Sequence, residues 1–297
     1  MVHIVTNRSS GAGRAREKAR ALAAELKLLG LNATVHAPTS AKDATSLVRS
    51  LPEEVVVVSA GGDGSHRAVA AGCIGTNRTM ALLAAGTGND YAAGLGLARI
   101  TPAELASAIR QAHVRTVDVG EVWLGNATEP DIFLNAFGMG FDADVAAHLK
   151  RIRGAPPLLN YTLSVVKRLP SLRTEHLTVS SEGRELWSEP SILAAALIGK
   201  QTGGGFTFAP HADYVGGELH ITLGGALTPS RFLKAVSQLL RTVPINVSGV
   251  STRRCCAVQY TWRSAVHAHL DGDPQGKIRS ARLGVRTDAL QLVMTNH

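Results

Sequence analysis

The chain has 297 residues, 45% of them hydrophobic, which is enough for one large domain or two ordinary ones with packed cores. The formal net charge of +8 favours acidic partners such as nucleotides or anionic membrane surfaces, although a solvated basic surface gives the same count. An aromatic content of only 4% argues against base stacking, so no nucleic-acid partner is expected. Three cysteines without a C-x-x-C motif argue against a disulfide framework and a structural zinc site.

The start of the chain predicts a strand and not a signal peptide, and no run approaches the ~20 apolar residues that span a bilayer. We therefore expect a cytoplasmic protein that would reach a lipid substrate from solution, as a peripheral protein. One basic cluster is a candidate contact for anionic lipid, the alternative being a solvated helix face. Its members are Lys150, Arg151, Arg153, Lys167 and Arg168.

The first third of the chain alternates apolar strands with helices, an order typical of a Rossmann-like, parallel α/β domain that binds ligands at the carboxyl ends of its strands. Gly30 predicts the end of the first helix, and a capping box at 101–104 predicts the start of the last. The expected strands are 3–6, 33–37, 55–60 and 80–84, and the expected helices are 14–29, 41–51, 65–73 and 102–112.

The pattern changes near Val114 to short strands separated by turn residues, as in an antiparallel sheet or sandwich. The expected strands are 116–119, 132–136, 177–180, 192–198, 219–223, 257–261, 266–270 and 290–294, and the expected helices are 142–151, with a resumption at 161–169, and 229–241. We therefore predict an α/β plus β fold, with an α/β nucleotide-binding domain over residues 1–115 and a β-rich domain over 116–288.

Two glycine loops each follow an apolar strand of the first domain. They are Gly61-Gly62-Asp63-Gly64-Ser65 and Gly86-Thr87-Gly88-Asn89-Asp90. Glycines leave no Cβ between backbone N–H groups and a ligand, so such loops can form an anion nest beside a helix N-terminus. Asp63 would repel a bare phosphate, which suggests an intervening metal or hydroxyl, the alternative being a tight turn with Asp63 as N-cap. Two such loops on neighbouring strands indicate a nucleotide-using enzyme, and a kinase first.

Side chains of these loops add to the prediction. Thr87 and Asn89 can donate to phosphate oxygens, while Asp90 can cap a helix or orient Asn89. His66, next to the first loop, is predicted to be a surface helix residue, the alternative being an approach to a nucleotide. A third candidate loop is Asn7-Arg8-Ser9-Ser10-Gly11-Ala12-Gly13. P-loop and protein-kinase motifs do not occur in the sequence.

Together these residues make the chain resemble the diacylglycerol kinase catalytic-domain family, which includes bacterial lipid kinases and sphingosine and ceramide kinases. NAD kinases share the first glycine loop, but the later motifs fit the lipid-kinase branch better. The matches, in family order, are Asn7, Ser10-Gly11, the two glycine loops, Asp118-Val119-Gly120, Phe133-Leu134-Asn135-Ala136, Gly138, Gly140, Asp142-Ala143 and Asp271-Gly272-Asp273.

The resemblance implies an ATP-binding α/β domain, a β-rich acceptor domain, an active site in the cleft between them, and a last strand, about 289–295, that returns to the first domain. ATP would be bound by both glycine loops and by Asn7, Ser10, Gly11 and Gly13. Asp63 would bind the Mg²⁺ ion that accompanies ATP. Asp273, at the acid of the family's D-G-E motif, would be the general base on the acceptor hydroxyl.

Two departures from the family pattern bear on activity. The D-G-E motif is Asp271-Gly272-Asp273 here, with a last acid one methylene shorter, and Asp271 is a candidate substitute base. Bacterial relatives carry an acidic pair before the glycine at Gly217 that holds a structural Mg²⁺. Because these places hold Val215 and Gly216, we expect that metal site to be absent or rebuilt from Asp213 and Glu218.

The sequence therefore predicts an ATP- and Mg²⁺-dependent kinase of a lipid hydroxyl, with diacylglycerol as the default acceptor. Two alternatives stay open: a kinase of a non-lipid alcohol such as a polyol or secondary metabolite, and a non-catalytic nucleotide-binding relative. The acceptor, the choice between ATP and GTP, and the oligomeric state, a homodimer included, are not specified by these motifs.

Overall fold

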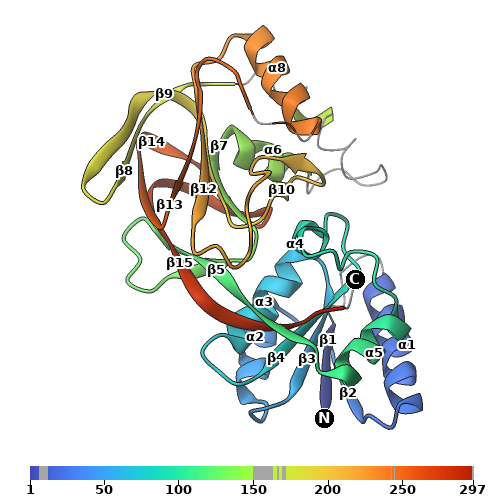
Figure 1. Cartoon of the computed structure of the whole chain (residues 1–297). Coiled ribbons are helices and arrows are strands. Elements are labelled where there is room, and N and C mark those ends of the chain that lie inside the picture. Colours follow the sequence, from blue (N-terminus) through green and yellow to red (C-terminus); the bar gives the residue numbers. More distant parts are fainter. Residues whose placement is uncertain are drawn as a thin grey trace. The chain divides into compact units, whose positions relative to one another are not determined.

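The computed structural model describes residues 1–6, 13–149, 163–165, 167–168, 172–241, 243 and 245–295. The chain divides into two compact units, which are Met1–Asp118 with Thr287–His297, and Val119–Arg286. They are referred to below as unit 1 and unit 2 (Figure 1). The sequence-based division lies near residue 115, with the returning strand at about 289–295. No helix in the described part of the chain is long and apolar enough to cross a membrane.

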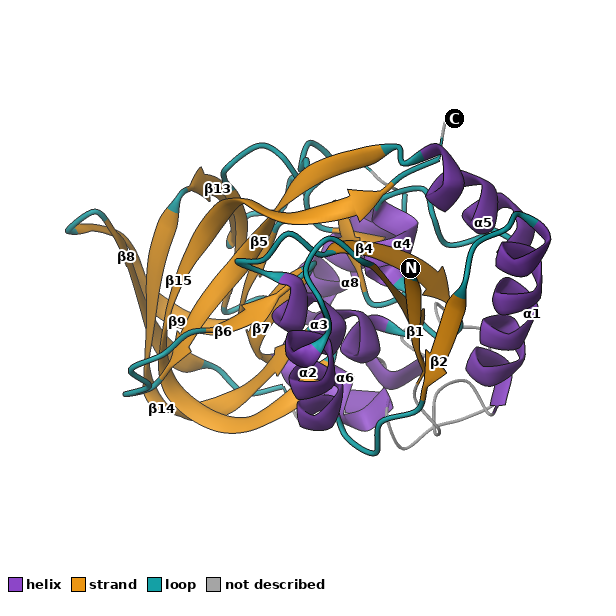
Figure 2. Cartoon of the chain, turned by 90° about the horizontal axis from the view of Figure 1, so that it is seen from below, coloured by secondary structure: helices purple, strands orange, loops and turns teal. Residues whose placement is uncertain are grey.

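Unit 1 is a parallel sheet covered by helices on both faces. Its strands follow the order β15-β4-β3-β1-β2, and all of these neighbouring pairs are parallel. Figure 2 shows α1 and α5 on one side of the sheet and α2 and α3 on the other. The elements are β1 (Val2–Thr6), α1 (Arg14–Leu28), β2 (Ala33–His36), α2 (Ala41–Ser50), β3 (Val56–Gly61), α3 (Asp63–Cys73), β4 (Thr79–Ala84), α4 (Asp90–Gly94), α5 (Pro102–Gln111), the start of β5 (Val114–Leu124) and the end of β15 (Asp273–Val293).

The sequence pattern explains most of unit 1. Residues of β1, β3 and β4 are almost all buried, as a sheet covered on both faces requires. Helix α1 buries Ala15, Ala19, Leu22 and Leu26, which recur at the spacing of one helix face. The predicted capping box of α5 is confirmed, with reciprocal bonds between Thr101 and Glu104.

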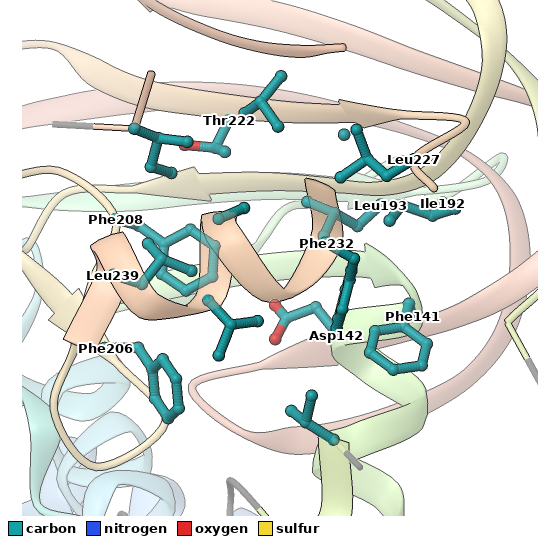
Figure 3. A pocket seen from close by; sticks show the side chains of 16 residues that line it. Phe141, Asp142, Ile192, Leu193, Phe206, Phe208, Thr222, Leu227, Phe232 and Leu239 are labelled. Atoms are coloured by element: carbon teal, nitrogen blue, oxygen red, sulfur yellow. The ribbon is translucent and has the colours of Figure 1, made fainter. Parts of the chain in front are cut away.

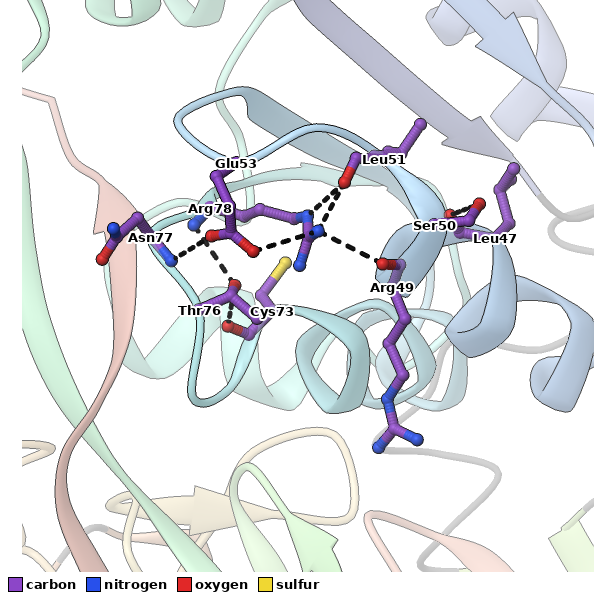
Figure 4. A network of polar contacts seen from close by, with 9 residues as sticks. All are labelled: Leu47, Arg49, Ser50, Leu51, Glu53, Cys73, Thr76, Asn77 and Arg78. Atoms are coloured by element: carbon purple, nitrogen blue, oxygen red, sulfur yellow. Dashed lines mark hydrogen bonds and ion pairs between the residues drawn. The ribbon is translucent and has the colours of Figure 1, made fainter.

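A buried arginine fixes the connections that lead into β3 and β4. Arg78, 5% exposed, donates to the carbonyl oxygens of Leu51 and Arg49 and pairs with Glu53 at 3.3 Å (Figure 4). Glu53 also accepts the Asn77 N–H at 2.8 Å. The loop before β3 and the loop before β4 are thus tied together where the two neighbouring strands begin.

Unit 2 is antiparallel. Its longest path of paired strands is β13-β12-β9-β7-β14-β15, with β8 beside both β9 and β14, and β6 beside β5. Its elements are the end of β5, β6 (Asp131–Phe133), β7 (Ala136–Gly140), α6 (Phe141–Leu149), β8 (Glu175–Ser181), β9 (Arg184–Leu197), β10 (Gln201–Thr202), β11 (Phe206–Thr207), β12 (Leu219–Gly225), α8 (Pro229–Leu240), β13 (Val250–Cys255), β14 (Ala257–Leu270) and most of β15.

Four strands of unit 2 close on themselves. β7 and β8 each pair with both β9 and β14, so that β7-β9-β8-β14 is a closed circuit of ladders. Tyr260 and Trp262 of β14 are fully buried, and the Tyr260 hydroxyl donates to the Ala195 carbonyl at 3.2 Å. Burial also raises the pKa of Tyr260 well above its ordinary value. The closed circuit gives the predicted β-rich domain a core of its own.

Several predicted boundaries are wrong. The strand expected at 132–136 is two strands, β6 and β7, and those expected at 257–261 and 266–270 are one strand, β14, with an irregular register against β15. The strand expected at 290–294 is only the end of β15, which begins at Asp273. The short elements α4, β10, β11 and β13 were not predicted.

Candidate active site

The two glycine loops of unit 1 lie against each other. β3 and β4 are neighbours in register, with Gly61 beside Ala84, so the loops leave the sheet at the same edge. A Cβ on Gly86 would lie 2.5 Å from the Cα of Gly62, which is closer than side chains tolerate. Glycine is therefore required where the two backbones meet, and the loops form one surface.

Asp63 joins the two loops. It is the first residue of α3, and its carboxylate accepts the backbone N–H groups of Asp90 and Tyr91 at 3.3 and 3.1 Å. These are N–H groups of the first turn of α4, which have no acceptor within that helix. Asp63 thus caps a helix, as the structural alternative proposed, but the helix is α4 and not its own. Its side chain is partly exposed, which leaves it within reach of a ligand.

Asn89 holds the second loop in shape. It has a positive φ of 57°, its side-chain oxygen accepts the Gly86 N–H at 2.9 Å, and its side-chain nitrogen donates to the Gly86 carbonyl at 3.1 Å. This role was not predicted, because the sequence suggested a direct contact with phosphate. Thr87 and Gly88 are exposed between these fixed ends.

The third candidate loop is seen only at its end. Asn7, Ser10 and Gly11 lie outside the described residues, whereas Gly13 precedes α1 with a φ of 96°. Lys18 of α1 donates to the carbonyl oxygen of Ala84 at 2.7 Å, two residues before the second glycine loop begins. This cation was missed because it belongs to no motif and reaches the loops only through the packing of α1.

His66 is a core residue. It is completely buried, and its Nδ1 lies 2.9 Å from the Ser59 hydroxyl of β3. Burial lowers the pKa of His66 to about 4. Both interpretations of His66 from the sequence are therefore wrong, because the first turn of α3 faces the sheet and places His66 behind the glycine loop.

In unit 2, the Asp271-Gly272-Asp273 motif is the tip of the β14–β15 hairpin. Asp271 and Gly272 have φ values of 48° and 78°, as both central residues of a two-residue type I′ turn require. Asp273 is the first residue of β15 and pairs with Leu270 in the ladder. The first two residues of the motif are therefore explained by the turn, and the third is left as a partly exposed acid beside it.

The Asp271 carboxylate is held by the chain between β6 and β7. Its oxygens accept the backbone N–H groups of Leu134, Asn135 and Ala136 at 2.9, 2.9 and 3.0 Å. These bonds to a side chain replace ladder bonds, which explains why the expected strand at 132–136 is broken. A carboxylate bound by three N–H donors is a poor proton acceptor, so the geometry argues against Asp271 as a substitute base.

A buried histidine and acid lie behind this turn. His269, 2% exposed, has its Nε2 2.8 Å from an oxygen of Asp142, which is 4% exposed. The Gly272 N–H donates to His269 Nδ1 at 3.2 Å. Because Nδ1 accepts a hydrogen bond, Nε2 carries the hydrogen and donates it to Asp142. His269 of β14 thus links the hairpin tip to α6.

Other motif residues of unit 2 are positions of close packing. A Cβ on Gly138 would lie 2.3 Å from Asp142 Oδ2, and one on Gly120 would lie 2.1 Å from the Phe133 ring. Asn135 donates to the Gln201 carbonyl at 2.7 Å and accepts the Tyr214 hydroxyl at 2.9 Å. These motif residues hold the chain around the hairpin tip.

The region in which a metal site was expected to be absent or rebuilt contains Asp213 and Glu218. Glu218 pairs with Arg254 at 3.3 Å, and the Asp213 carbonyl accepts the Gly216 N–H. Among the described residues, no group of three or more His, Cys, Asp or Glu side chains is arranged to hold a metal ion.

Unit 2 also contains an apolar pocket between α6, α8 and the strands (Figure 3). Its cavity measures about 50 Å³. Asp142, the partner of His269, lies on its wall, and Thr222 is the other lining side chain with a polar atom. The remaining lining residues are Phe141, Val165, Ile192, Leu193, Phe206, Phe208, Gly224, Leu227, Phe232, Ala235, Val236, Leu239, Ile245 and Val250.

Comparisons with known proteins agree with these features. The diacylglycerol kinase catalytic domain matches residues 1–122, and the YegS C-terminal NAD kinase beta sandwich-like domain matches residues 135–294. A diacylglycerol kinase of Mycobacterium tuberculosis is 26% identical, covering 100% of this chain and 96% of that protein, and one of Bacillus subtilis is 25% identical, covering 93% and 90%.

A solved structure of a putative diacylglycerol kinase from Bacillus anthracis has the same fold. It has a TM-score of 0.77 at 18% identity and covers 99% of this chain and 96% of that one. The predicted fold class and family resemblance are confirmed. The chain belongs to the diacylglycerol kinase family of phosphotransferases, with a diacylglycerol kinase catalytic domain followed by a YegS C-terminal domain.

Proposed function

We propose that this protein is an ATP- and Mg²⁺-dependent lipid kinase that transfers the γ-phosphoryl group of ATP to the hydroxyl of a diacylglycerol-type acceptor. The observation that carries the proposal is the apolar pocket of unit 2, whose lining suits an acyl chain better than a polyol. A volume of about 50 Å³ holds only a few water-sized groups, so a long chain requires the pocket to widen.

The glycine loops of unit 1 are the proposed ATP site. The paired turns at Gly62 and Gly86 have no Cβ that would keep a ligand from the backbone, and they lie beside the start of α3, where negative charge is favoured. Asp63 would hold Mg²⁺ together with the nucleotide phosphates, the usual ligand set of this ion. When bound, the ion neutralises charge that develops on the transferred group. Asn89 keeps the second loop in the shape that accepts the phosphates.

Asp273 is the proposed general base. As the acceptor oxygen attacks the γ-phosphorus, the Asp273 carboxylate takes the hydroxyl proton and ADP leaves with the electrons of the broken bond. Asp271 is bound by three N–H groups and orients the hairpin tip on which Asp273 lies. His269 and Asp142 support the same tip through the Gly272 N–H.

The test is phosphorylation of a short-chain diacylglycerol and of a lipid extract with Mg²⁺ and ATP, read by mass spectrometry. The Asp273→Asn variant is the matched control, because it changes one oxygen for a nitrogen of the same size. A lipid that gains one phosphate only with the unmutated protein supports the proposal. Nucleotide binding with no lipid product contradicts it.

The alternative acceptor is a small alcohol, which the limited volume of the cavity favours. Glycerol and a panel of polyols in the same assay distinguish the two. Phosphorylation of the water-soluble acceptors alone would replace the lipid in the proposal and leave the roles of Asp63 and Asp273 unchanged.

A further inference from the structure

Helix α8 has an apolar inner face and an exposed outer face of unusual composition. Phe232, Ala235 and Leu239 are buried and line the apolar pocket, as Figure 3 shows for Phe232 and Leu239. Leu233 and Leu240, one heptad apart and thus on one flank of the helix, are 52% and 38% exposed. The apolar surface of α8 therefore continues from the pocket wall out to solvent.

The exposed part of α8 and the residues after it are basic as well as apolar. We call this set the α8 surface. It consists of Arg231, Leu233, Lys234, Leu240, Arg241 and Val243, all of them exposed. On a helical projection the Leu233 and Leu240 flank lies next to the pocket face, and Lys234 and Arg241 point farther outward.

The region of the chain that contains the α8 surface carries basic side chains and no acidic ones. From Leu219 to Leu270 the sequence contains six Lys or Arg residues and no Asp or Glu. The α8 surface lies within this stretch, so no acidic neighbour in sequence neutralises Arg231, Lys234 or Arg241. Exposed leucines beside cations that have no acidic neighbour in sequence are features of helices that lie in the interface of anionic membranes.

We infer that the α8 surface docks unit 2 on an anionic lipid bilayer, with Leu233, Leu240 and Val243 entering the acyl boundary and the three cations contacting lipid phosphates. A protein partner would need a complementary acidic surface, whereas a bilayer supplies both the acyl layer and the negative charge. Because the inner face of α8 forms the pocket wall, docking places this wall at the membrane. Delivery of the acceptor past α8 rests on the proposed function; docking itself does not.

Vesicle cosedimentation without nucleotide tests the docking directly. The probes are vesicles of phosphatidylcholine alone and of phosphatidylcholine with an equal part of phosphatidylglycerol. We expect binding to the anionic vesicles only, weakened by salt because the attraction is screened. The Leu233→Ser/Leu240→Ser and Lys234→Glu/Arg241→Glu variants should each bind about tenfold more weakly or worse, since each removes inserted or attracted groups.

Matched controls are Leu28→Ser, an exposed leucine on α1, and Lys277→Glu, an exposed lysine on β15. Both should bind like the unmutated protein. Circular dichroism melting of every variant verifies folding, which is expected because the changed side chains are exposed. Unchanged binding by folded α8 variants, or an equal loss in the Leu28 or Lys277 variant, would overturn the inference.

Kinase assays separate this inference from the proposed function. With a water-dispersed short-chain diacylglycerol, α8 variants should keep the unmutated rate, and with diacylglycerol in anionic vesicles they should lose about tenfold. Vesicle binding through α8 without any lipid phosphorylation would contradict the proposed function and leave the docking intact. Equal rates on vesicles for α8 variants and unmutated protein would contradict the docking.

Discussion

The glycine turn of unit 1 and the hairpin turn of unit 2 each contain an acid bound by backbone N–H groups from a distant segment. In unit 1, Asp63 accepts two such bonds and is also the proposed Mg²⁺ ligand. In unit 2, Asp271 accepts three, and the proposed chemistry is left to Asp273. In unit 1, one side chain thus both holds the loop in place and takes the proposed part in the reaction. In unit 2, these two roles are divided between Asp271 and Asp273.

A buried histidine lies next to each turn, and the two histidines have different hydrogen-bond partners. His66 faces a neutral hydroxyl, and burial lowers its pKa to about 4. His269 faces the Asp142 carboxylate and accepts the Gly272 N–H. The first turn is therefore supported by a histidine that must stay uncharged in the core. The second turn is supported by a histidine whose two ring nitrogens are both hydrogen-bonded. The following changes test this difference.

Replacing Asp273 with Asn should have the largest effect on activity. Loss of a general base reduces the rate by about 10²–10⁴-fold, and the unfolding midpoint should stay unchanged because Asp273 is partly exposed. Steady-state kinase assays and urea unfolding check the two halves of this prediction. Asp273→Glu, which restores the family's acid, should remain active. An active Asp273→Asn enzyme would show that the chemistry does not reside in Asp273.

Replacing Asp271 with Asn should mainly lower stability. The amide has one oxygen acceptor and sets an N–H₂ group against the N–H groups of Leu134, Asn135 and Ala136, so we expect the free energy of unfolding to fall by about 1–3 kcal/mol. Urea unfolding measures it, with Asp131→Asn as an exposed control on β6. Full stability with abolished activity would instead place Asp271 in the chemistry.

Acidification should destabilise the core behind the first turn. The pKa of His66 is about 4 when folded and near 6.5 when unfolded, so the unfolded state binds the additional proton between these values. Stability is therefore complete above pH 6.5 and falls by up to about 3 kcal/mol as the pH drops to 4. Urea unfolding across this range in His66→Asn should show a flatter curve, and an unchanged slope would contradict the assignment.

Replacing Gly86 with Ala should lower stability modestly and weaken nucleotide binding. The new Cβ would lie 2.5 Å from the Cα of Gly62, which forces the two loops apart at a cost of about 1–3 kcal/mol. Calorimetric titration with ATP should show weaker binding. Gly284→Ala, where the nearest atom lies 4.0 Å away, is the control. Equal affinity in both variants would show that close approach of the loops is not needed for the nucleotide.

The sequence predicted what depends on local pattern. The buried strands β3 and β4 and the stripe of α1 follow from unbroken apolar runs and helical spacing, and both glycine loops follow from their position after those strands. The family motifs also indicated the acids of both turns. Their division of roles could not be predicted, because it depends on bonds between residues far apart in sequence.

The failures have the same origin. Helix α4 has only five residues and begins where the distant Asp63 caps it. The break after Phe133 is caused by Asp271, 137 residues from Leu134. His66 carries a polar side chain on a helix whose orientation is set by packing against distant elements, and that orientation places it beside Ser59 of β3. Each of these features depends on tertiary contacts, which cannot be predicted from local sequence propensity.

The place of β15 in unit 1 has a consequence for how the protein folds during synthesis. Leu292 of β15 pairs with Met80 of β4, and Thr79 donates to Gln291 across 212 residues. Until the end of β15 leaves the ribosome, β4 therefore has an unpaired edge beside a strand of buried apolar residues. We therefore expect nascent unit 1 to need protection from aggregation, and a fragment that stops before β15 should aggregate through β4.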